Sequence, residues 1–306
     1  MVKALTYRLL SLAPLIFIIS SITFLIIHFI PGDPVDLMLG DYASEAERET
    51  LRMSLGLSGS LWDQYLHFTS NLFKFDLGTS IFSDTSVTSL ILQRMPATLE
   101  LTLVSIFLSC LWGIPLGVLT ASTKSKNLDF LGTSLGVLGM SIPGYFLGPV
   151  LIWIFSVGMG ILPVGGRENF SSLILPSLSL ALPLGAILMR MTRAAMQEVL
   201  TQEYIRVAYA KGITKKELYF KHALKNALMP IITVVGLQIG TLLTGTVITE
   251  TIFSWPGLGT LLFDAINQRD YPIVQGCIII IACIYVIVNF LTDVLYTIAN
   301  PKVVNI

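Results

Sequence analysis

Six long apolar segments separated by polar loops limit what this chain can fold into. The first runs from Leu9 to Gly32, 24 residues without a formal charge. About 20 consecutive apolar residues are enough to cross a bilayer as an α-helix. The other five segments lie at about 97–121, 131–160, 171–191, 231–252 and 273–299. We therefore expect an all-α integral membrane protein with six transmembrane helices.

A cleaved signal peptide is the alternative interpretation of the first segment, because it also has basic residues before an apolar run. Lys3 and Arg8 precede the segment. A signal peptide, however, has a shorter apolar region that ends in a small-residue cleavage site. The stretch 30–34, with sequence IPGDP, offers no such site. We expect the segment to remain in the protein as a transmembrane helix.

Overall composition agrees with a membrane protein and excludes several other classes. The 306 residues are 54% hydrophobic and 12% charged, which is about half the charged fraction of a typical soluble domain. The formal net charge is zero, so nothing points to nucleic acid as a partner. The three cysteines lie inside apolar runs, where they are expected to act as small hydrophobic residues rather than as disulfides or metal ligands.

Charge is distributed unevenly between the loops, and this predicts the orientation. Residues 31–94 contain nine Asp or Glu and four Lys or Arg, which suits the outside. If both termini are cytoplasmic, the cytoplasmic side carries 13 of the 19 basic residues, as the positive-inside rule requires. We expect a first transmembrane helix (1–30), an extracytoplasmic segment (31–94), a five-helix core (95–299) and a cytoplasmic tail (300–306).

The extracytoplasmic segment is expected to be a small helical unit. Ser44 and Glu47 have the spacing of a capping box, and Gly56 is a plausible helix stop. An aromatic-rich amphipathic stretch follows between Trp62 and Phe73. Such a stretch suits either the membrane interface or a site beneath a partner protein. A small folded cap on the helix bundle is the interpretation we favour.

The loop at 193–228 is a long polar interruption between two apolar segments, and its pattern is helix, break, helix. Good helix formers run from Glu203 to Lys211, and Gly212 suits the left-handed cap that ends a helix. Thr214 and Glu217 then have the spacing of a second capping box. Small residues near the end of the first helix would let another protein approach its backbone. We interpret this helix as a mechanical contact point.

The same loop carries a resemblance to a known family. Arg206-Val207-Ala208 with Gly212, followed by Ala227-Leu228-Met229-Pro230, resembles the coupling motif of ABC-transporter permeases, although Arg206 and Val207 replace its usual Glu and Ala. The longer spacing is similar to the dipeptide, oligopeptide and nickel branch. Further stretches also resemble that branch: 31–34, 76–80, 96–101, 174–177, 250–259 and 269–272.

The resemblance implies the fold and function of a type I ABC importer permease in the bacterial cytoplasmic membrane. It implies that the chain, which is not itself an enzyme, pairs with a second homologous permease, two ABC ATPase subunits and an extracytoplasmic solute-binding protein. ATP and Mg²⁺ would be bound by the ATPases, and this chain would hold no cofactor. The implied cargo is di- or oligopeptides, with nickel, metal chelates or glutathione as alternatives. The implied ATPase-coupling residues are Glu203, Arg206, Val207, Ala208, Ala210, Lys211 and Gly212.

Sequence motifs for chemistry are missing, so we expect neither catalytic residues nor a metal site. There is no G-x-x-x-x-G-K-[ST] and no H-E-x-x-H. The fifth apolar segment is the most polar, and a helical stripe on it holds Gln238, Thr241, Gly245 and Thr249. That stripe either lines a translocation pathway or forms interhelical hydrogen bonds. An ion-coupled secondary transporter ranks lower, because mid-membrane carboxylates and internal symmetry are not found.

Overall fold

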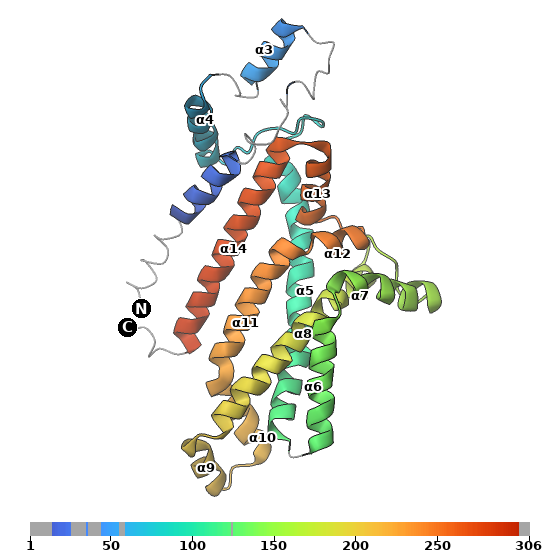
Figure 1. Ribbon diagram of the computed structural model, residues 1–306, viewed down its shortest axis with the longest axis vertical. Coiled ribbons are helices and arrows are strands. Elements are labelled where there is room, and N and C mark those ends of the chain that lie inside the picture. Colours follow the sequence, from blue (N-terminus) through green and yellow to red (C-terminus); the bar gives the residue numbers. More distant parts are fainter. Residues whose placement is uncertain (1–13, 26–34, 36–43, 55–58, 124, 300–306) are drawn as a thin grey trace.

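The computed structural model describes residues 14–25, 35, 44–54, 59–123 and 125–299 (Figure 1). Within these ranges the regular structure is helical, apart from one isolated bridge between Thr79 and Ser86. The all-α prediction is confirmed. The helices are Pro14–Leu25, α3 (Glu45–Ser54), α4 (Leu61–Phe73), α5 (Val87–Ser122), α6 (Lys126–Ser141), α7 (Gly144–Leu151), α8 (Phe170–Leu200), α9 (Glu203–Ala210), α10 (Lys215–Glu217), α11 (Leu224–Gly245), α12 (Val247–Ile252), α13 (Leu258–Gln268) and α14 (Tyr271–Ala299), with π-helical turns at Ile152–Gly158 and Leu218–Ala223.

Four helical stretches are long and apolar enough to cross a membrane: Val87–Ser122, Phe170–Leu200, Lys215–Leu243 and Tyr271–Tyr296. A fifth candidate is the pair Gly132–Ser141 and Gly144–Gly158, which is bent by 97°. The bend falls at Pro143, where the sequence predicts a kink, because a residue before proline is pushed out of the helical region. Most of the expected first span, the tail 300–306 and Gly56 lie outside the described residues.

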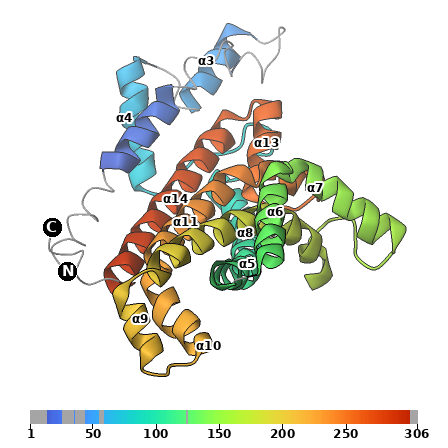
Figure 2. The same ribbon diagram turned by 60° about the horizontal axis from the view of Figure 1, so that its bottom comes forward.

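The core of the bundle is a close pair formed by α5 and α8, which adjoin each other in Figure 2. A Cβ at Gly113 would lie 2.6 Å from the carbonyl oxygen of Gly185, and one at Gly117 would lie 2.7 Å from that of Met189. Glycine is required here because the two backbones are in contact. Both numbers rise together along the two helices, so α5 and α8 run in the same direction.

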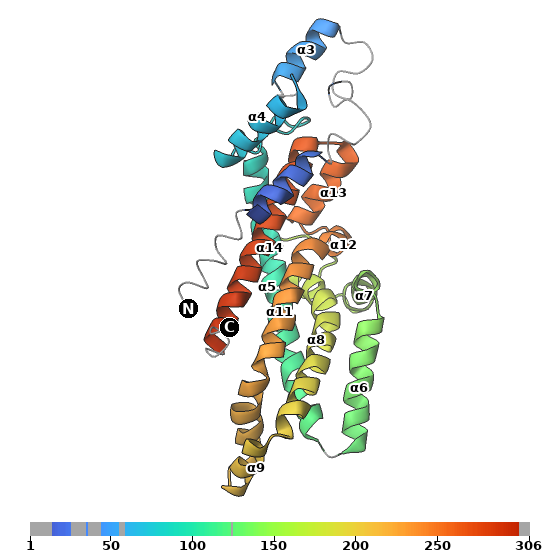
Figure 3. The ribbon, with the colours of Figure 1, turned by 60° about the vertical axis from the view of Figure 1, so that its left-hand side comes forward.

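The other long helices alternate in direction around this pair. Gly236 of α11 meets Thr292 of α14, and Gly240 meets Tyr285, so these two helices are antiparallel. The polar ends of the molecule lie far apart: α3 and α4 are at one end, and α9 and α10 are at the other (Figures 1 and 3).

The expected fifth span, 231–252, is not one helix. α11 ends at Gly245 and α12 begins at Val247, with Thr246 between them. The prediction of an uninterrupted span was wrong because α12 carries Glu250, a fully buried carboxylate. Hydrogen bonds to α5 and α13 hold that carboxylate, so the segment after the break packs among helices instead of continuing toward lipid.

Candidate functional site

The short helix α9 lies at the tip of the polar end and is anchored from one side. Ile205 is 5% exposed and lies in a hydrophobic cluster with Met196 of α8, and with Leu218 and Ala223 of the following π-helical turn. The opposite face presents large side chains to solvent, among them Val207, which is 53% exposed. α9 is therefore fixed to the ends of α8 and α11 while its outer face remains open.

The end of α9 has the geometry that the sequence predicts. Lys211 is the C-cap, and Gly212 has φ +81°, the left-handed conformation that favours glycine. A Cβ on Gly212 would meet nothing within 4 Å in this chain. Gly212 is thus explained here by its backbone conformation, and the space around it is open.

The second helix also begins where predicted, but only half of its capping box forms. Thr214 Oγ1 accepts a hydrogen bond from the backbone N–H of Glu217 at 3.3 Å. The Glu217 carboxylate does not return to Thr214. It pairs instead with Lys221, one helical turn later, at 2.9 Å.

The predicted coupling residues divide between two faces of α9. Glu203, Arg206, Val207, Ala210, Lys211 and Gly212 are exposed. Ala208 is half-buried and packs against the cluster around Ile205. Tyr204 adds an exposed aromatic ring, and partial burial raises the pKa of its phenol, while a hydrogen bond with Asn226 acts in the opposite direction.

The residues predicted to form a stripe in the fifth span are separated by the helix break. Gln238 is 5% exposed, and its Nε2 donates to the carbonyl oxygen of Leu184 in α8 at 2.8 Å. Thr241 is exposed, whereas Thr249 is buried on α12 beyond the break. Gly245 is the last residue of α11. For Gln238 the geometry is that of an interhelical hydrogen bond, one of the two alternatives that the sequence left open.

Comparison with protein families decides what kind of protein this is. The model described as "Binding-protein-dependent transport system inner membrane component" matches residues 113–305. Its N-terminal companion, "Binding-prot-dependent transport system membrane comp, N-term", matches residues 1–102. The chain belongs to this family. It is an ABC importer permease of the peptide and nickel branch, a transporter subunit rather than an enzyme.

Individual relatives of the permease agree with this assignment. It is 40% identical over 296 residues to "Glutathione transport system permease protein GsiC" from Escherichia coli O6:H1 (strain CFT073), covering 97% of each chain. The GsiC protein of Pectobacterium atrosepticum is also 40% identical. An inward-facing structure of the MetNI methionine ABC transporter matches 69% of this chain and 96% of its own, with TM-score 0.60 and 21% identity. An amino acid ABC transporter structure gives TM-score 0.52 at 20% identity. The structural matches show the shared fold.

Membership of this family implies that the permease works in the inner membrane with ATPase subunits and a binding protein. α9 is the exposed element at one end of the permease. The opposite end holds three polar junctions that the sequence motifs did not explain.

The first junction is built around Glu250. Its Oε1 accepts from Thr98 Oγ1 of α5 at 2.8 Å, and its Oε2 accepts from the backbone N–H of Thr260 at 2.9 Å. Thr98 in turn accepts from the N–H of Leu258 at 2.7 Å. The Glu250 side chain therefore provides acceptors, directly and through Thr98, for N–H groups at the start of α13 that have no partner within that helix. A Cβ at Gly257 would lie 2.3 Å from Glu250 Oε1, so a larger residue does not fit there.

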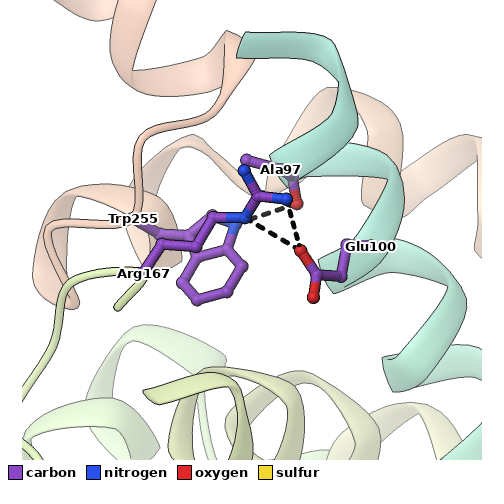
Figure 4. A network of polar contacts seen from close by, with 4 residues as sticks. All are labelled: Ala97, Glu100, Arg167 and Trp255. Atoms are coloured by element: carbon purple, nitrogen blue, oxygen red, sulfur yellow. Dashed lines mark hydrogen bonds and ion pairs between the residues drawn. The ribbon is translucent and has the colours of Figure 1, made fainter. Parts of the chain in front are cut away.

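The second junction is a half-exposed ion pair over a buried indole (Figure 4). Arg167 Nε and Nη2 lie 2.9 and 2.8 Å from the same oxygen of Glu100. The guanidinium carbon is 5.9 Å from the ring centroid of Trp255, within the range of cation–π attraction. Trp255 Nε1 donates to the carbonyl oxygen of Ala97 at 2.8 Å. The loop before α8 is thus tied to α5 and to the α12–α13 connection.

The third junction joins distant parts of the chain through Asp270. This carboxylate is 1% exposed and accepts from Ser80 Oγ at 2.6 Å and from the N–H of Ile81 at 3.1 Å. Ser80 and Asp270 lie in stretches that resemble the permease branch, but the sequence assigns them no contact. The polar residues inside apolar surroundings were the available signal, but their partners lie far away in the sequence.

Proposed function

We propose that the permease imports small peptides, and that glutathione, itself a tripeptide, is the first candidate substrate. Relatives 40% identical over 97% of their length carry the name glutathione permease. Di- and oligopeptides are the wider class in which this substrate falls. In this proposal the permease forms half of the translocation pathway and pairs with a second homologous permease.

The proposed coupling to ATPase subunits rests on the way α9 is anchored to the long helices. Ile205 fixes it between α8 and α11, while Val207 and Tyr209 face outward. A rigid helix of this kind transmits a push from a docked ATPase into two long helices at once. We assign this coupling role to Glu203, Arg206, Val207, Ala208, Ala210, Lys211 and Gly212. Two ATPase subunits would supply ATP and Mg²⁺ binding.

The proposed topology has six spans, with residues 31–94 outside and both termini in the cytoplasm. If the five candidate spans all cross the membrane and alternate in direction, the start of α5 and the end of α14 lie on opposite sides of it. One further span at the N-terminus then returns the N-terminus to the side of the C-terminus. The basic loop that contains α9 is cytoplasmic in this arrangement, as the positive-inside rule favours.

A substitution at Gly212 tests the coupling role. Gly212→Trp should abolish substrate-stimulated ATPase activity and uptake in proteoliposomes that contain the whole transporter. Lys216→Trp, at another exposed position of the same loop, is the matched control. Gly212→Asn distinguishes strain in the backbone from obstruction of the ATPase contact, because asparagine tolerates the left-handed conformation but adds a side chain. Undiminished uptake by Gly212→Trp would show that this end of α9 does not contact the ATPase.

The substrate is tested separately from the coupling. The companion binding protein should retain glutathione or a dipeptide during purification, and mass spectrometry of the released ligand identifies it. Uptake of labelled glutathione that unlabelled dipeptides do not inhibit would assign glutathione as the substrate. A binding protein that retains only a metal chelate would overturn the peptide assignment without affecting the role of α9.

A further inference from the structure

The aromatic helix α4 in the extracytoplasmic segment has an apolar arc of which only half is covered. Tyr65 and Phe68 pack against Phe24 of the helix Pro14–Leu25, with ring centroids 5.3 and 5.6 Å apart. The Tyr65 hydroxyl also forms a 2.6 Å hydrogen bond with Ser21 Oγ. Figure 2 shows α4 crossing this apolar helix. One side of α4 is therefore docked on the helix Pro14–Leu25, which belongs to the proposed first span.

The uncovered half of the arc is a stripe of large apolar side chains. Trp62, Leu66 and Phe73 are 66%, 50% and 80% exposed. At 100° per residue they fall within about 40° of one another around the helix. This stripe directly adjoins the side that packs on Pro14–Leu25, whose residues Phe17 and Ile22 are also exposed. The ring of Tyr65 connects the two helices on this side, with centroids 5.8 Å from Trp62 and 6.3 Å from Phe17.

The remaining face of α4 is polar and marks the direction of water. Asp63, His67 and Ser70 lie on it and are exposed. Ser60 caps the helix by a reciprocal box with Asp63, and hydrogen bonds from the Ser60 side chain and then from its backbone hold the pKa of Asp63 below its usual range. A stably capped helix with one apolar and one polar face is the form taken by helices that lie in a membrane surface.

The position of α4 along the bundle fits the outer boundary of the membrane. Phe75, two residues after α4, accepts a hydrogen bond at its carbonyl oxygen from Thr88 in the first turn of α5. Neighbouring Val87 packs in a cluster with Ile273 and Cys277, in the first two turns of the span that begins at Tyr271. The end of α4 is thereby held beside the start of a transmembrane helix.

From these observations we infer that α4 is an interfacial helix, whose stripe Trp62–Leu66–Phe73 is inserted among the lipids of the outer leaflet. Lipid is the occupant because the stripe adjoins the apolar surface of the helix Pro14–Leu25, and this argument rests on the proposed topology, in which that helix is part of the first span. Tryptophan is enriched at this depth, and Lys74 at the end of α4 is placed to extend its ammonium group toward the headgroups. The expected insertion is about 5–10 Å into the boundary between headgroups and acyl chains.

Spin labels at single cysteines test this assignment in the full chain, in lipid nanodiscs, with Cys110, Cys277 and Cys283 replaced by alanine. Labels at Trp62→Cys, Leu66→Cys and Phe73→Cys should collide with oxygen and be protected from a water-soluble nickel chelate. The matched controls Asp63→Cys, His67→Cys and Ser70→Cys should show the reverse. An alternation between these two sets along one helix requires a lipid surface on one side.

A second measurement does not depend on cysteines. Benzoyl-phenylalanine in place of Leu66 should form phospholipid adducts on illumination, whereas the same group in place of His67 should not. The experiment is repeated on the permease assembled with its partner subunits and binding protein. Nickel access equal at both sets of positions, or crosslinks from position 66 to a partner protein instead of lipid, would overturn the assignment.

Discussion

At the scale of single residues, the hydrogen bonds of Glu250 leave the least room for substitution. It is fully buried, and its two oxygens accept hydrogen bonds from α5 and α13. Glu250→Gln should lower the free energy of unfolding by about 1–3 kcal/mol, because in either orientation the amide NH2 would face groups that now donate, either the backbone N–H of Thr260 or the hydroxyls of Thr98 and Thr246. Glu100→Gln, in a half-exposed ion pair, should cost only about 0–1 kcal/mol. Thermal unfolding of the purified permease compares the two.

An equal loss of stability in both variants would contradict the role given to Glu250. A further control is Thr98→Val, which removes the hydroxyl donor but keeps the shape of the side chain. It should reproduce part of the Glu250→Gln effect, and the double variant should lose less than the sum of the two, since both changes act on one hydrogen bond.

The sequence alone predicts the left-handed cap at Gly212 but not the hydrogen-bond partners of Glu250. The first depends on neighbouring residues, and the second depends on residues that are far away in the sequence. The left-handed cap at Gly212 depends on residues within one turn of it, so its φ of +81° follows from local pattern. The hydroxyl of Thr98 that binds Glu250 lies 152 residues away, and the Ser80 hydroxyl that binds Asp270 lies 190 residues away. No local rule pairs groups at such separations.

At the scale of elements, α9 combines an anchored face with an open one, and the two faces can be tested apart. Ile205→Ala should destabilise the attachment of α9 by about 2–5 kcal/mol, because it leaves a cavity in the cluster shared with α8. It should reduce both the unfolding temperature and ATPase stimulation. Val207→Asp, on the exposed face, should reduce ATPase stimulation while the unfolding temperature stays unchanged.

Comparison of the two variants in the assembled transporter checks this division. Full ATPase stimulation in Val207→Asp would show that the open face of α9 does not touch the ATPase. A loss of stimulation in both variants without any loss of stability in Ile205→Ala would show that the anchoring cluster contributes little.

The sequence predicts helix ends that depend on nearby capping residues. It does not predict helix ends that depend on tertiary contacts. Ser44 and Thr214 begin helices as expected, and Pro143 lies at the predicted bend. The break at Thr246 was missed, because the residues on either side of it, LTG at 243–245 and VIT at 247–249, are apolar or carry hydroxyl groups and predict a continuous helix. The buried carboxylate that follows it redirects the chain.

At the scale of the whole molecule, the parallel pairing of α5 with α8 determines how the chain must return across the membrane. Both helices begin at the end that holds the polar junctions, so residues 123–169 must cross back between them. The bent pair formed by α6 and α7 is the part of the chain available for this crossing, although its 97° bend also suits a re-entrant loop. Apolar run length alone does not distinguish these two cases, whereas the direction of the neighbouring helices does.

Cysteines on either side of the bent pair test this crossing. Asn127→Cys and Glu168→Cys are both exposed positions. We expect a membrane-impermeant maleimide added to intact spheroplasts to label Glu168→Cys and to label Asn127→Cys only after permeabilisation. Ser70→Cys on α4 and Lys216→Cys beside α9 serve as the outer and inner references. Labelling of Asn127→Cys and Glu168→Cys from the same side would mean that α6 and α7 form a re-entrant loop, and the parallel arrangement of α5 and α8 would then be incompatible with a common membrane plane.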